Sequence, residues 1–298
     1  MTPAHQLTLN LSGRLVSLEK PLVMGIVNVT PDSFFAGSRI DGAKALRARL
    51  DTLVREGAAL ADLGAYSSRS GAEEVSPEEE RRRLRPALQI LRDEYPDLPV
   101  SVDTFRSDVA RMAVEEYGAA VINDISGGGL DPAMYRTMAE LQVPYILMHM
   151  KGDPQTMQQQ ASYSDVTLEV IDYFAQRVGQ LLELGVHDII LDPGFGFSKT
   201  TTQNYELLAQ LGSLVDAFTQ PLLVGVSRKS MIYRPLGITP EEALSGTTFV
   251  HALALERGAK ILRVHDVRPA VEAVQLYEEL RPFLRTEGAL HYQHLRPL

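Results

Sequence analysis

Eight short runs rich in Val, Ile and Leu recur along the 298-residue chain, and longer amphipathic stretches separate them. Runs of this length are typical of buried parallel strands, and the stretches between them have the spacing of helices. The runs are 21–29, 58–65, 99–104, 119–125, 144–150, 188–194, 221–227 and 260–266. Eight strands that each precede a helix favour an α/β fold, the (β/α)₈ or TIM barrel.

An open, doubly wound sheet is the alternative arrangement of such strands. That fold would usually carry a glycine-rich dinucleotide turn after its first strand, and the residues after 21–29 do not contain one. Because no linker or shift in composition divides the chain, we expect a single barrel domain over 21–285. A short N-terminal β-hairpin over 1–20, turning at Ser12 and Gly13, precedes it, and a tail over 286–298 follows it.

The stretches between the runs contain signals for the ends of helices. Ser76, Pro77 and Glu79 form a capping box with proline at the first helical position, and the segment 239–242 (TPEE) repeats the device. Four glycines fall just before a strand, where a glycine ends a helix: Gly57, Gly118, Gly185 and Gly258. These signals predict helices between the strands, as a barrel requires.

Composition excludes several classes of function. The chain has no cysteine, which rules out disulfides, thiolate zinc sites, iron–sulfur clusters and a cysteine nucleophile. The formal net charge of −9 argues against a nucleic-acid partner. No apolar run approaches the length of a membrane span, and the start of the chain lacks an export signal. We therefore expect a cytoplasmic protein without a membrane or nucleic-acid partner.

Each apolar run contains a polar residue at or near its C-terminal end, although buried parallel strands should be almost wholly apolar. The eight residues are Asn28, Asp62, Asp103, Asn123, His149, Asp192, Ser227 and His265. In a TIM barrel the C-terminal ends of the strands carry the active site. Because the strand starts show no comparable set, the pattern predicts a functional site at that face.

The acidic residues and the amide in this set restrict the ligand. Buried carboxylates need donors or a cation, so Asp62, Asp103, Asn123 and Asp192 would hold either a metal or a ligand with several N–H groups. The histidines are scattered, and the spacings typical of metal sites are missing. The alternative ligand is a flat heterocycle such as an aminopyrimidinone. The side chains of Asp and Asn can bind the edge of such a ring through paired hydrogen bonds.

Basic residues lie on other strands of the predicted barrel. Arg263 and His265 are two residues apart and so share one strand face, Lys229 follows Ser227, and Arg69 lies in a glycine-flanked loop. Cationic groups that converge on one mouth suit a phosphate or pyrophosphate. The segment 194–200 (GFGFSKT) resembles a phosphate loop but lacks the glycine before the lysine, so we do not predict one there.

Eight segments of the chain, in order, closely resemble the dihydropteroate synthases of folate biosynthesis. They are MGIVNVTPDSF (24–34), DLGAYSSRSGA (62–72), SVDT (101–104), INDISGG (122–128), LMHMKGDPQTMQ (147–158), LDPGFGFSKT (191–200), GVSRKS (225–230) and RVHDV (263–267). The resemblance extends from about residue 20 to 282 and implies a TIM barrel. It also implies a transferase that condenses 6-hydroxymethyl-7,8-dihydropterin pyrophosphate with p-aminobenzoate. Dihydropteroate and pyrophosphate would be the products, sulfonamides the inhibitors, and the enzyme a cytoplasmic homodimer.

The resemblance also implies a role for individual residues. The pterin side comprises Asp62, Asp103, Asn123, Met148, Asp192 and Lys229. The pyrophosphate side comprises Asn28, Arg69, Arg263 and His265, with Mg²⁺ as the cofactor at Asn28. The aminobenzoate side comprises Ser68, Arg69, Ser70, Phe197 and Ser227. The catalytic residues among them are Asp103, Lys229, Arg263 and His265, and none is assigned as a general base.

The chain departs from the family pattern in its second loop. It has Tyr66, Ser68 and Ser70 where many members carry Glu, Thr and Pro. Proline reduces the conformations that a loop must give up on closing, so we expect weaker aminobenzoate binding and reduced sulfonamide sensitivity here. Replacing Ser70 by proline should tighten aminobenzoate binding roughly two- to five-fold if the loop accommodates it.

Two other functions fit parts of the same pattern. A pterin-dependent corrinoid methyltransferase barrel shares the carboxylate-lined pocket but needs no cluster for pyrophosphate. A non-catalytic barrel that binds a pterin as a carrier or regulator is the second. Lys229, Arg263 and His265, together with the segment NVTPDSF, weigh against the methyltransferase, and the residues of the anion site weigh against the non-catalytic barrel.

Overall fold

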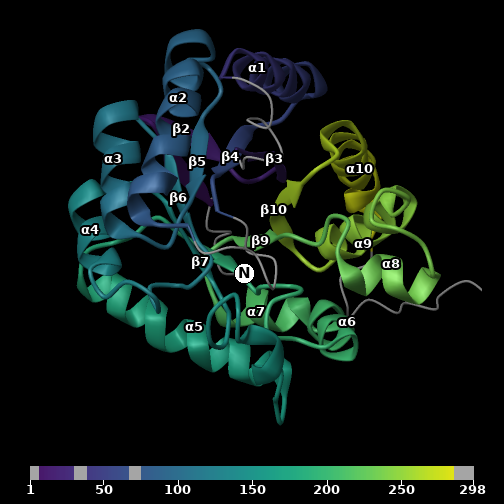
Figure 1. The fold of residues 1–298 in the computed structure, drawn as a ribbon. Helices are drawn as coiled ribbons and strands as arrows, with labels where there is room; N and C mark the ends of the chain where they lie inside the picture. Colours follow the sequence, from purple (N-terminus) through teal and green to yellow (C-terminus); the bar gives the residue numbers. More distant parts are fainter. Residues whose placement is uncertain (1–6, 30–38, 67–74, 285–298) are drawn as a thin grey trace, which may run out of the picture.

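A computed structural model describes residues 7–29, 39–66 and 75–284. Eight parallel strands form a closed barrel in the order β10-β3-β4-β5-β6-β7-β8-β9, and helices surround it (Figure 1). The predicted TIM barrel is therefore confirmed, and the open doubly wound sheet is wrong. Parallel pairing of every neighbouring pair of strands brings all the strand C-termini to one face.

Each of the eight predicted apolar runs coincides with a barrel strand, although the last strand begins one residue before its run. The strands are β3 (Leu22–Asn28), β4 (Leu60–Gly64), β5 (Val100–Asp103), β6 (Val121–Asp124), β7 (Tyr145–Met148), β8 (Ile189–Asp192), β9 (Leu222–Val224) and β10 (Ala259–Val264). The helices are α1 (Arg39–Glu56), α2 (Pro77–Glu94), α3 (Ser107–Tyr117), α4 (Met134–Leu141), α5 (Val166–Glu183), α6 (Thr201–Ala209), α7 (Leu211–Ala217), α8 (Ser230–Leu236), α9 (Leu244–Glu256) and α10 (Val267–Leu280). Two short 3-10 helices, η2 (Met157–Gln160) and η3 (Arg281–Phe283), complete the described elements.

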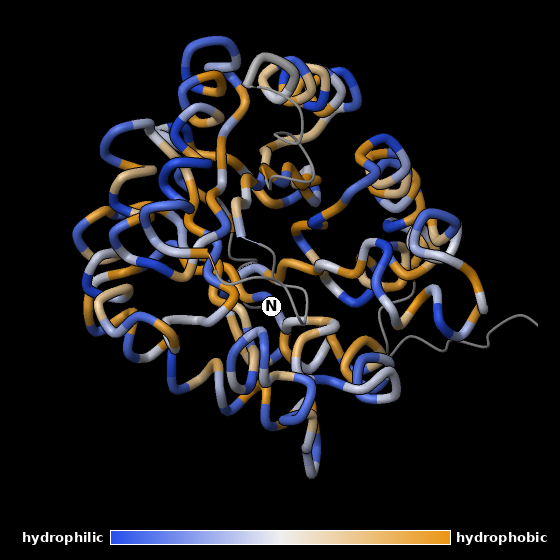
Figure 2. Tube along the Cα trace, viewed as in Figure 1, coloured by the Kyte–Doolittle hydropathy of each residue, from blue (hydrophilic) through white to orange (hydrophobic). Residues whose placement is uncertain are grey.

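Alternation along each strand sorts its side chains between two cores. Outward residues pack beneath the helices, and the apolar segments of strands and helices face one another in Figure 2. Inward residues form an apolar layer inside the barrel that includes Met24, Leu60, Val121, Ile146, Ile190, Leu223 and Ile261. Because side chains on one face recur every two residues, the next inward positions on β4, β6, β8 and β10 are Asp62, Asn123, Asp192 and Arg263. A polar layer therefore lies directly above the apolar one.

The N-terminal hairpin closes the opposite end of the barrel. β1 (Thr8–Leu11) pairs antiparallel with β2 (Arg14–Ser17), and Ser12 and Gly13 turn the chain with φ of 51° and 82°. Positive φ at both central residues is the requirement of a tight two-residue hairpin turn. Leu9, Leu11 and Leu18 are buried against the inner apolar layer, so the hairpin acts as a plug.

The helix signals in the sequence are confirmed with one exception. The Ser76 side chain accepts a hydrogen bond from the Glu79 amide, and all four predicted C-terminal glycines have positive φ. At 239–242, however, the Glu242 carboxylate accepts a hydrogen bond from the Thr239 amide within a turn, and α9 begins only at Leu244. The expectation of a helix start at Pro240 is therefore wrong.

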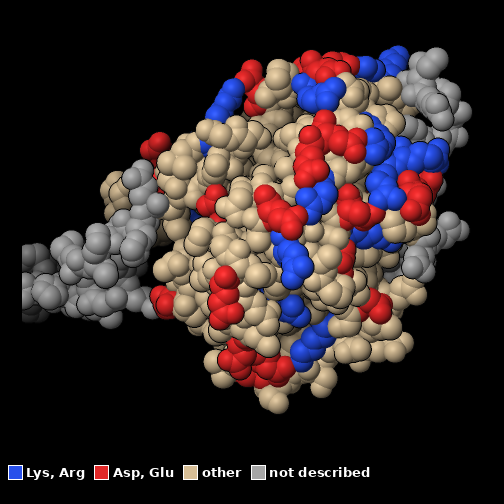
Figure 3. Space-filling model, turned by 90° about the vertical axis from the view of Figure 1, so that its left-hand side faces the viewer, with Lys and Arg blue, Asp and Glu red and all other residues tan. Residues whose placement is uncertain are grey.

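The outer face formed by α2, α3 and α4 carries intermixed charges, as the space-filling view shows (Figure 3). Ion pairs connect neighbouring helices: Arg81 with Asp108, Arg85 with Glu116, and Arg111 with Glu140. Within the described ranges, every helix is too short or too polar to cross a bilayer.

Candidate active site

Asp62 is the centre of the polar layer at the C-terminal face. Its carboxylate is fully buried and accepts a hydrogen bond from Ser101 Oγ at 2.7 Å on the neighbouring strand β5. Asn123 Nδ2 on β6 donates to the same carboxylate at 3.2 Å. Arg263 Nε on β10 donates to Asp62 Oδ2 at 2.6 Å. Four strands therefore meet at one carboxylate, which the surrounding donors hold in a single orientation.

Arg263 is shared between two carboxylates. Besides Asp62 it contacts Asp103, whose Oδ2 lies 3.0 Å from the guanidinium Nη2. Burial opposes the charge on Arg263, but Asp62 and Asp103 outweigh burial and raise the pKa of the guanidinium above its usual value. Burial raises the pKa of Asp103 to about 7, with Arg263 opposing and Asp62 adding to the rise. When Asp62 and Asp103 are both ionised they share one cation, and an N–H donor from a ligand could relieve the net negative charge that remains.

Asp192 and Lys229 form the opposite side of the layer. Asp192 Oδ1 accepts a hydrogen bond of 2.8 Å from the Gly194 amide, and burial raises the pKa of Asp192, with Lys229 opposing that rise. Lys229 Nζ donates to the Phe195 carbonyl oxygen. Burial lowers the pKa of Lys229 to about 8, and Asp192 opposes this. The Asp192 carboxylate and the Lys229 ammonium thus each favour the charged form of the other.

His265 and Ser227 lie side by side just beyond the ends of β10 and β9. Ser227 Oγ accepts a hydrogen bond from the His265 amide at 3.2 Å and lies 3.1 Å from His265 Nδ1. Burial lowers the pKa of His265 to about 4, and Arg263 and Arg228 lower it further. His265 is thus neutral near pH 7, whereas the sequence suggested a cationic group.

Asn28 ends β3 at the rim of the polar layer, where its side chain is exposed. A Cβ atom added to the neighbouring Gly64 would lie 3.8 Å from Asn28 Oδ1 and 3.7 Å from Asp103 Oδ2, so two oxygen donors surround this glycine. Within the described ranges, no three His, Cys, Asp or Glu side chains gather closely enough to hold a metal by themselves. The metal-cluster interpretation of the acids therefore lacks support among these residues.

An apolar cluster borders the polar layer. Ile125, Met148, Met150 and Met157 are buried together, and Phe105 and Phe197 pack against them. The Phe197 ring centroid lies 4.7 Å from Lys229 Nζ, which is within the range of a cation–π contact. Met148 and Phe197, predicted from the sequence for different substrates, thus belong to one continuous apolar surface.

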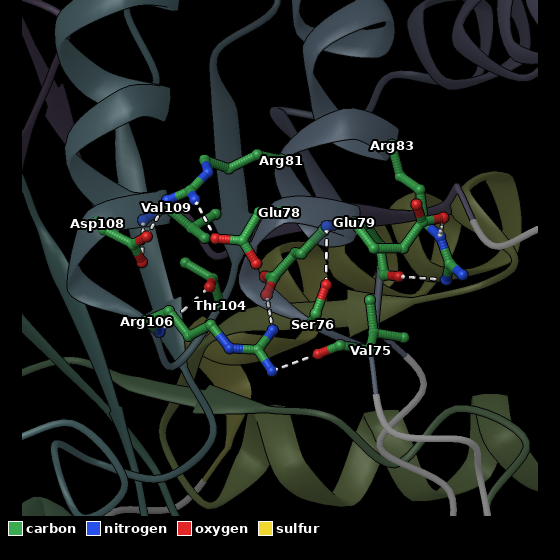
Figure 4. A network of polar contacts seen from close by, with 12 residues as sticks. Val75, Ser76, Glu78, Glu79, Arg81, Arg83, Thr104, Arg106, Asp108 and Val109 are labelled. Atoms are coloured by element: carbon green, nitrogen blue, oxygen red, sulfur yellow. Dashed lines mark hydrogen bonds and ion pairs between the residues drawn. The ribbon is translucent and has the colours of Figure 1, made fainter.

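The start of α2 is attached to the turn that follows Asp103. Arg106 donates to the buried carboxylate of Glu80 and to the Val75 carbonyl oxygen, and Figure 4 shows its guanidinium pointing toward Val75. The same guanidinium lies over the Phe105 ring at 4.7 Å, and Phe105 meets Tyr66 edge to face at 5.3 Å. These contacts hold both flanks of the segment 67–74.

The structure brings most of the predicted site residues to one mouth, while Ser68, Arg69 and Ser70 lie outside the described residues. The sequence did not indicate Ser101, which orients Asp62, or Lys199, whose Nζ lies 2.9 Å from His149 Nδ1. A serine inside an apolar strand is a signal for Ser101. For Lys199 the sequence offers no such signal, because the segment 194–200 does not match the pattern of a phosphate loop.

A cavity of about 490 Å³ lies outside the barrel between α2 and α3, away from this mouth. Arg81, Arg85 and Arg111 line it, but each already pairs with an acidic residue. An anion would have to displace those partners, so the mouth of the barrel remains the candidate site.

Known proteins are similar to this chain over the whole of the barrel. The family described as "Pterin binding enzyme" matches residues 24–265, which extend from β3 to the end of β10. The dihydropteroate synthase of Escherichia coli (strain K12) is 42% identical over 272 residues, which cover 89% of this chain and 94% of that protein.

Two solved structures are similar over nearly their whole length. Dihydropteroate synthase from Xanthomonas albilineans in complex with 7,8-dihydropteroate is 38% identical, with a TM-score of 0.81, and the match covers 92% of this chain and 99% of that one. Yersinia pestis dihydropteroate synthase with a sulfonamide drug complex is 37% identical, with a TM-score of 0.85, over 93% of this chain and 100% of that one.

Proposed function

The chain belongs to the pterin binding enzyme family, and from this premise we propose that it catalyses the step that makes dihydropteroate. The substrates are 6-hydroxymethyl-7,8-dihydropterin pyrophosphate and p-aminobenzoate. The products are 7,8-dihydropteroate and pyrophosphate. The chain is thus a transferase of folate biosynthesis, like the relatives that it resembles over most of its length.

The acids and the amide of the polar layer bind the pterin in this proposal. Asp62, Asn123 and Asp192 offer acceptors and an amide to the edge of a heterocycle that carries ring N–H and amino donors. Asp103 adds a carboxylate that Arg263 must share with Asp62. The negative charge left over in this group favours a ring that becomes positive during the reaction.

The other side of the mouth holds the leaving group. Arg263 lies on β10 and His265 just beyond its end, and Asn28 lies on β3, the strand that pairs directly with β10. Mg²⁺ fits beside Asn28 because it prefers oxygen donors and usually takes one or two protein ligands together with substrate phosphates. Asn28 Oδ1 would hold the ion, which when bound supplies positive charge to the pyrophosphate.

The reaction exchanges a C–O bond for a C–N bond. The bond from the exocyclic carbon of the pterin to pyrophosphate breaks, and its electron pair leaves with the pyrophosphate. The aminobenzoate nitrogen donates its lone pair to the same carbon and then loses a proton to water. Because the amine attacks in its neutral form, we assign no general base. Phe197 and Ser227 provide an apolar surface and a hydroxyl for the aminobenzoate ring and its polar end.

The observation that carries this proposal is the group of Asp62, Asp103, Asn123 and Arg263 at the end of four strands. A methyl-transfer barrel would need an acid-lined pocket but no group for pyrophosphate, which is the role proposed here for Arg263 and His265. A carrier protein would bind the pterin without catalysing a reaction between the two substrates.

The test is release of pyrophosphate that depends on p-aminobenzoate. We expect pyrophosphate and dihydropteroate in equal amounts when the purified protein receives both substrates and Mg²⁺. Methyl transfer to a corrinoid without release of pyrophosphate would support the methyltransferase instead. Tight pterin binding without any turnover would support the non-catalytic barrel, and either result would overturn the proposal.

We also expect sulfonamides to compete with aminobenzoate, as the ligand of the Yersinia pestis structure suggests. Reduced sensitivity would follow from Tyr66, Ser68 and Ser70, and paired inhibition measurements on the wild type and Ser70→Pro test this. A homodimer in the cytoplasm is part of the same proposal, and sedimentation of the purified protein tests its oligomeric state.

A further inference from the structure

Lys199 is an ammonium group buried without a carboxylate in contact. It follows β8 at the end of the segment 194–199, and only 3% of the residue is exposed. Among the described residues, no acidic side chain comes within ion-pair distance of it. Burial lowers the pKa of Lys199 to about 7, and Asp192 opposes this from further away. An ammonium held in such a place is costly, so its contacts need an explanation.

Three acceptors surround the Lys199 ammonium. Nζ lies 2.9 Å from His149 Nδ1 and 3.1 Å from each of the carbonyl oxygens of Gly194 and Phe197. An ammonium has three N–H donors, so each one has an acceptor. His149 is itself only 1% exposed, and burial together with Lys199 lowers its pKa well below the usual range. Neutral His149, protonated at Nε2, can offer the Nδ1 lone pair to the ammonium.

The segment 194–199 is held at both of its ends, by the close approach of Gly194 to His149 and by the contacts of Lys199. A Cβ atom on Gly194 would lie 2.0 Å from the His149 carbonyl oxygen, and Gly194 has a φ of +70°. Only glycine can therefore bring the chain so close to the end of β7. At the other end, the carbonyl oxygens of Gly194 and Phe197 both accept hydrogen bonds from Lys199 Nζ.

Three site residues depend on the same segment in different ways. Phe197 is held directly, because its carbonyl oxygen accepts from Lys199. Lys229 instead donates to the Phe195 carbonyl oxygen, and Asp192 accepts from the Gly194 amide. Lys229 and Asp192 thus contact the main chain of the segment and not Lys199 itself, whereas without Lys199 the Phe197 carbonyl loses a direct partner and the Phe197 backbone keeps the hydrogen bond from its amide to the Gly194 carbonyl oxygen.

We propose that Lys199 and His149 form an internal support that positions Phe197 for aminobenzoate. The inference rests on the proposed function for the identity of the ligand. Lys199 is a positioning residue in this account, because its Nζ is enclosed by protein acceptors and does not reach the open mouth. His149 shares the role by supplying the contact that comes from the chain just after β7.

The kinetic test compares variants of the two residues. We expect Lys199→Met to raise the aminobenzoate KM about ten-fold, because aminobenzoate would then have to order the Phe197 backbone as it binds. The KM for the pterin pyrophosphate should change less than about three-fold. His149→Leu should act like Lys199→Met. His149→Asn should restore most of the loss, because its amide oxygen offers an acceptor near the position of Nδ1.

Lys260→Met is the matched control, since Lys260 is a half-buried lysine on β10 that does not contact the segment 194–199. It should leave both KM values unchanged. A merely structural role for Lys199 would lower the fraction of active enzyme and hence kcat, with both KM values intact. That result in an active wild type, or equal rises in the two KM values, would overturn the inference.

A second measurement does not require turnover. Amide hydrogen exchange of residues 194–199 should become faster in Lys199→Met and remain at the wild-type rate in Lys260→Met. Unchanged exchange in Lys199→Met would overturn the inference even if the kinetics moved. A wild-type protein that releases no pyrophosphate would instead refute the proposed function, and the exchange rates would still decide whether Lys199 supports the segment.

Discussion

At the scale of single residues, the mouth of the barrel holds two buried carboxylates that share one guanidinium. Arg263 bridges Asp62 and Asp103, and these two acids lie on β4 and β5 while the arginine lies on β10. The raised pKa of Asp103, about 7, reflects burial that one shared guanidinium does not offset. A ligand that donates hydrogen bonds would stabilise this group further.

We expect Asp103→Asn to weaken binding of the pterin pyrophosphate about ten- to hundred-fold and to leave the fold intact. A hydrogen bond to a charged acceptor contributes about 1.5–3 kcal/mol, and the amide still accepts from Arg263. Calorimetric titration measures the affinity, and the exposed Asp97→Asn is the control. An unchanged affinity for the substrate would remove Asp103 from the pterin site.

His251 on α9 is a buried histidine with no role in the proposed reaction. Its Nε2 has no hydrogen-bond partner in the part of the chain that the structure describes. Burial lowers the pKa of His251 from 6.5 to about 4, with Asp266 opposing. The unfolded chain therefore binds a proton between these pH values that the folded protein does not, so His251 makes the protein less stable as the pH falls from 6.5 toward 4.

We predict that His251→Leu loses less of its free energy of unfolding than the wild type does as the pH falls from 7 to 4. At pH 4 the wild type should have lost up to about 3 kcal/mol more of its free energy of unfolding than the variant, relative to pH 7. Urea denaturation at both pH values measures the difference. The exposed His187→Gln should follow the wild-type profile, and parallel profiles for wild type and His251→Leu would contradict the assignment.

Among the outer elements, ion pairs of two kinds join the helices. Arg106 and Glu80 form a buried pair, with side chains only 13% and 1% exposed, between the turn before α3 and the first turn of α2. Arg111 and Glu140 form an exposed pair between α3 and α4, on the face with intermixed charges in Figure 3. Exposed pairs contribute little because water screens them, whereas breaking a buried pair leaves an uncompensated charge.

We expect Arg106→Met to lower the free energy of unfolding by about 3–5 kcal/mol at neutral pH. Arg111→Met, the matched control, should cost less than about 1 kcal/mol. Burial already raises the pKa of Glu80, so in Arg106→Met the carboxyl should take up a proton and the loss should shrink at pH 5. Denaturation at two pH values checks this, and equal losses for both variants would contradict it.

For the molecule as a whole, the two ends of the barrel have different tasks. The hairpin seals the N-terminal end, and Leu11 is 2% exposed against the inner apolar layer. The polar layer and the candidate site lie at the other end, above that layer. Stability and binding are thus served by opposite faces, as is general for this fold.

We predict that Leu11→Ala lowers the stability of the whole barrel by about 2–5 kcal/mol, the cost of a cavity in a core. Both KM values should remain at wild-type levels, because the cavity is far from the mouth. Leu15→Ala on the same hairpin should have little effect, since Leu15 is 75% exposed. A separate early unfolding step, rather than a shift of the main transition, would show that the hairpin is an independent unit.

The sequence alone was enough to predict the barrel and to choose the face at which the candidate site is proposed. Strand and helix periodicities are local, so eight runs with polar residues near their C-terminal ends could be recognised without coordinates. The same local rule failed at 239–242, where the capping pattern closes a turn through the Glu242 carboxylate and the helix begins only at Leu244. Local propensity is a weak guide to where a helix begins.

Only the tertiary structure decided which of these side chains are partners. Asp62 and Arg263 are 201 positions apart in the chain, and they meet because β3 alone separates β4 from β10 in the closed barrel. Lys199 and His149 meet because the segment after β8 folds back over the end of β7. Strand order and register set such pairings, and neither is encoded in the pattern of a single strand. The residue types are therefore a local property of the sequence, while their hydrogen bonds and pKa shifts arise from barrel closure.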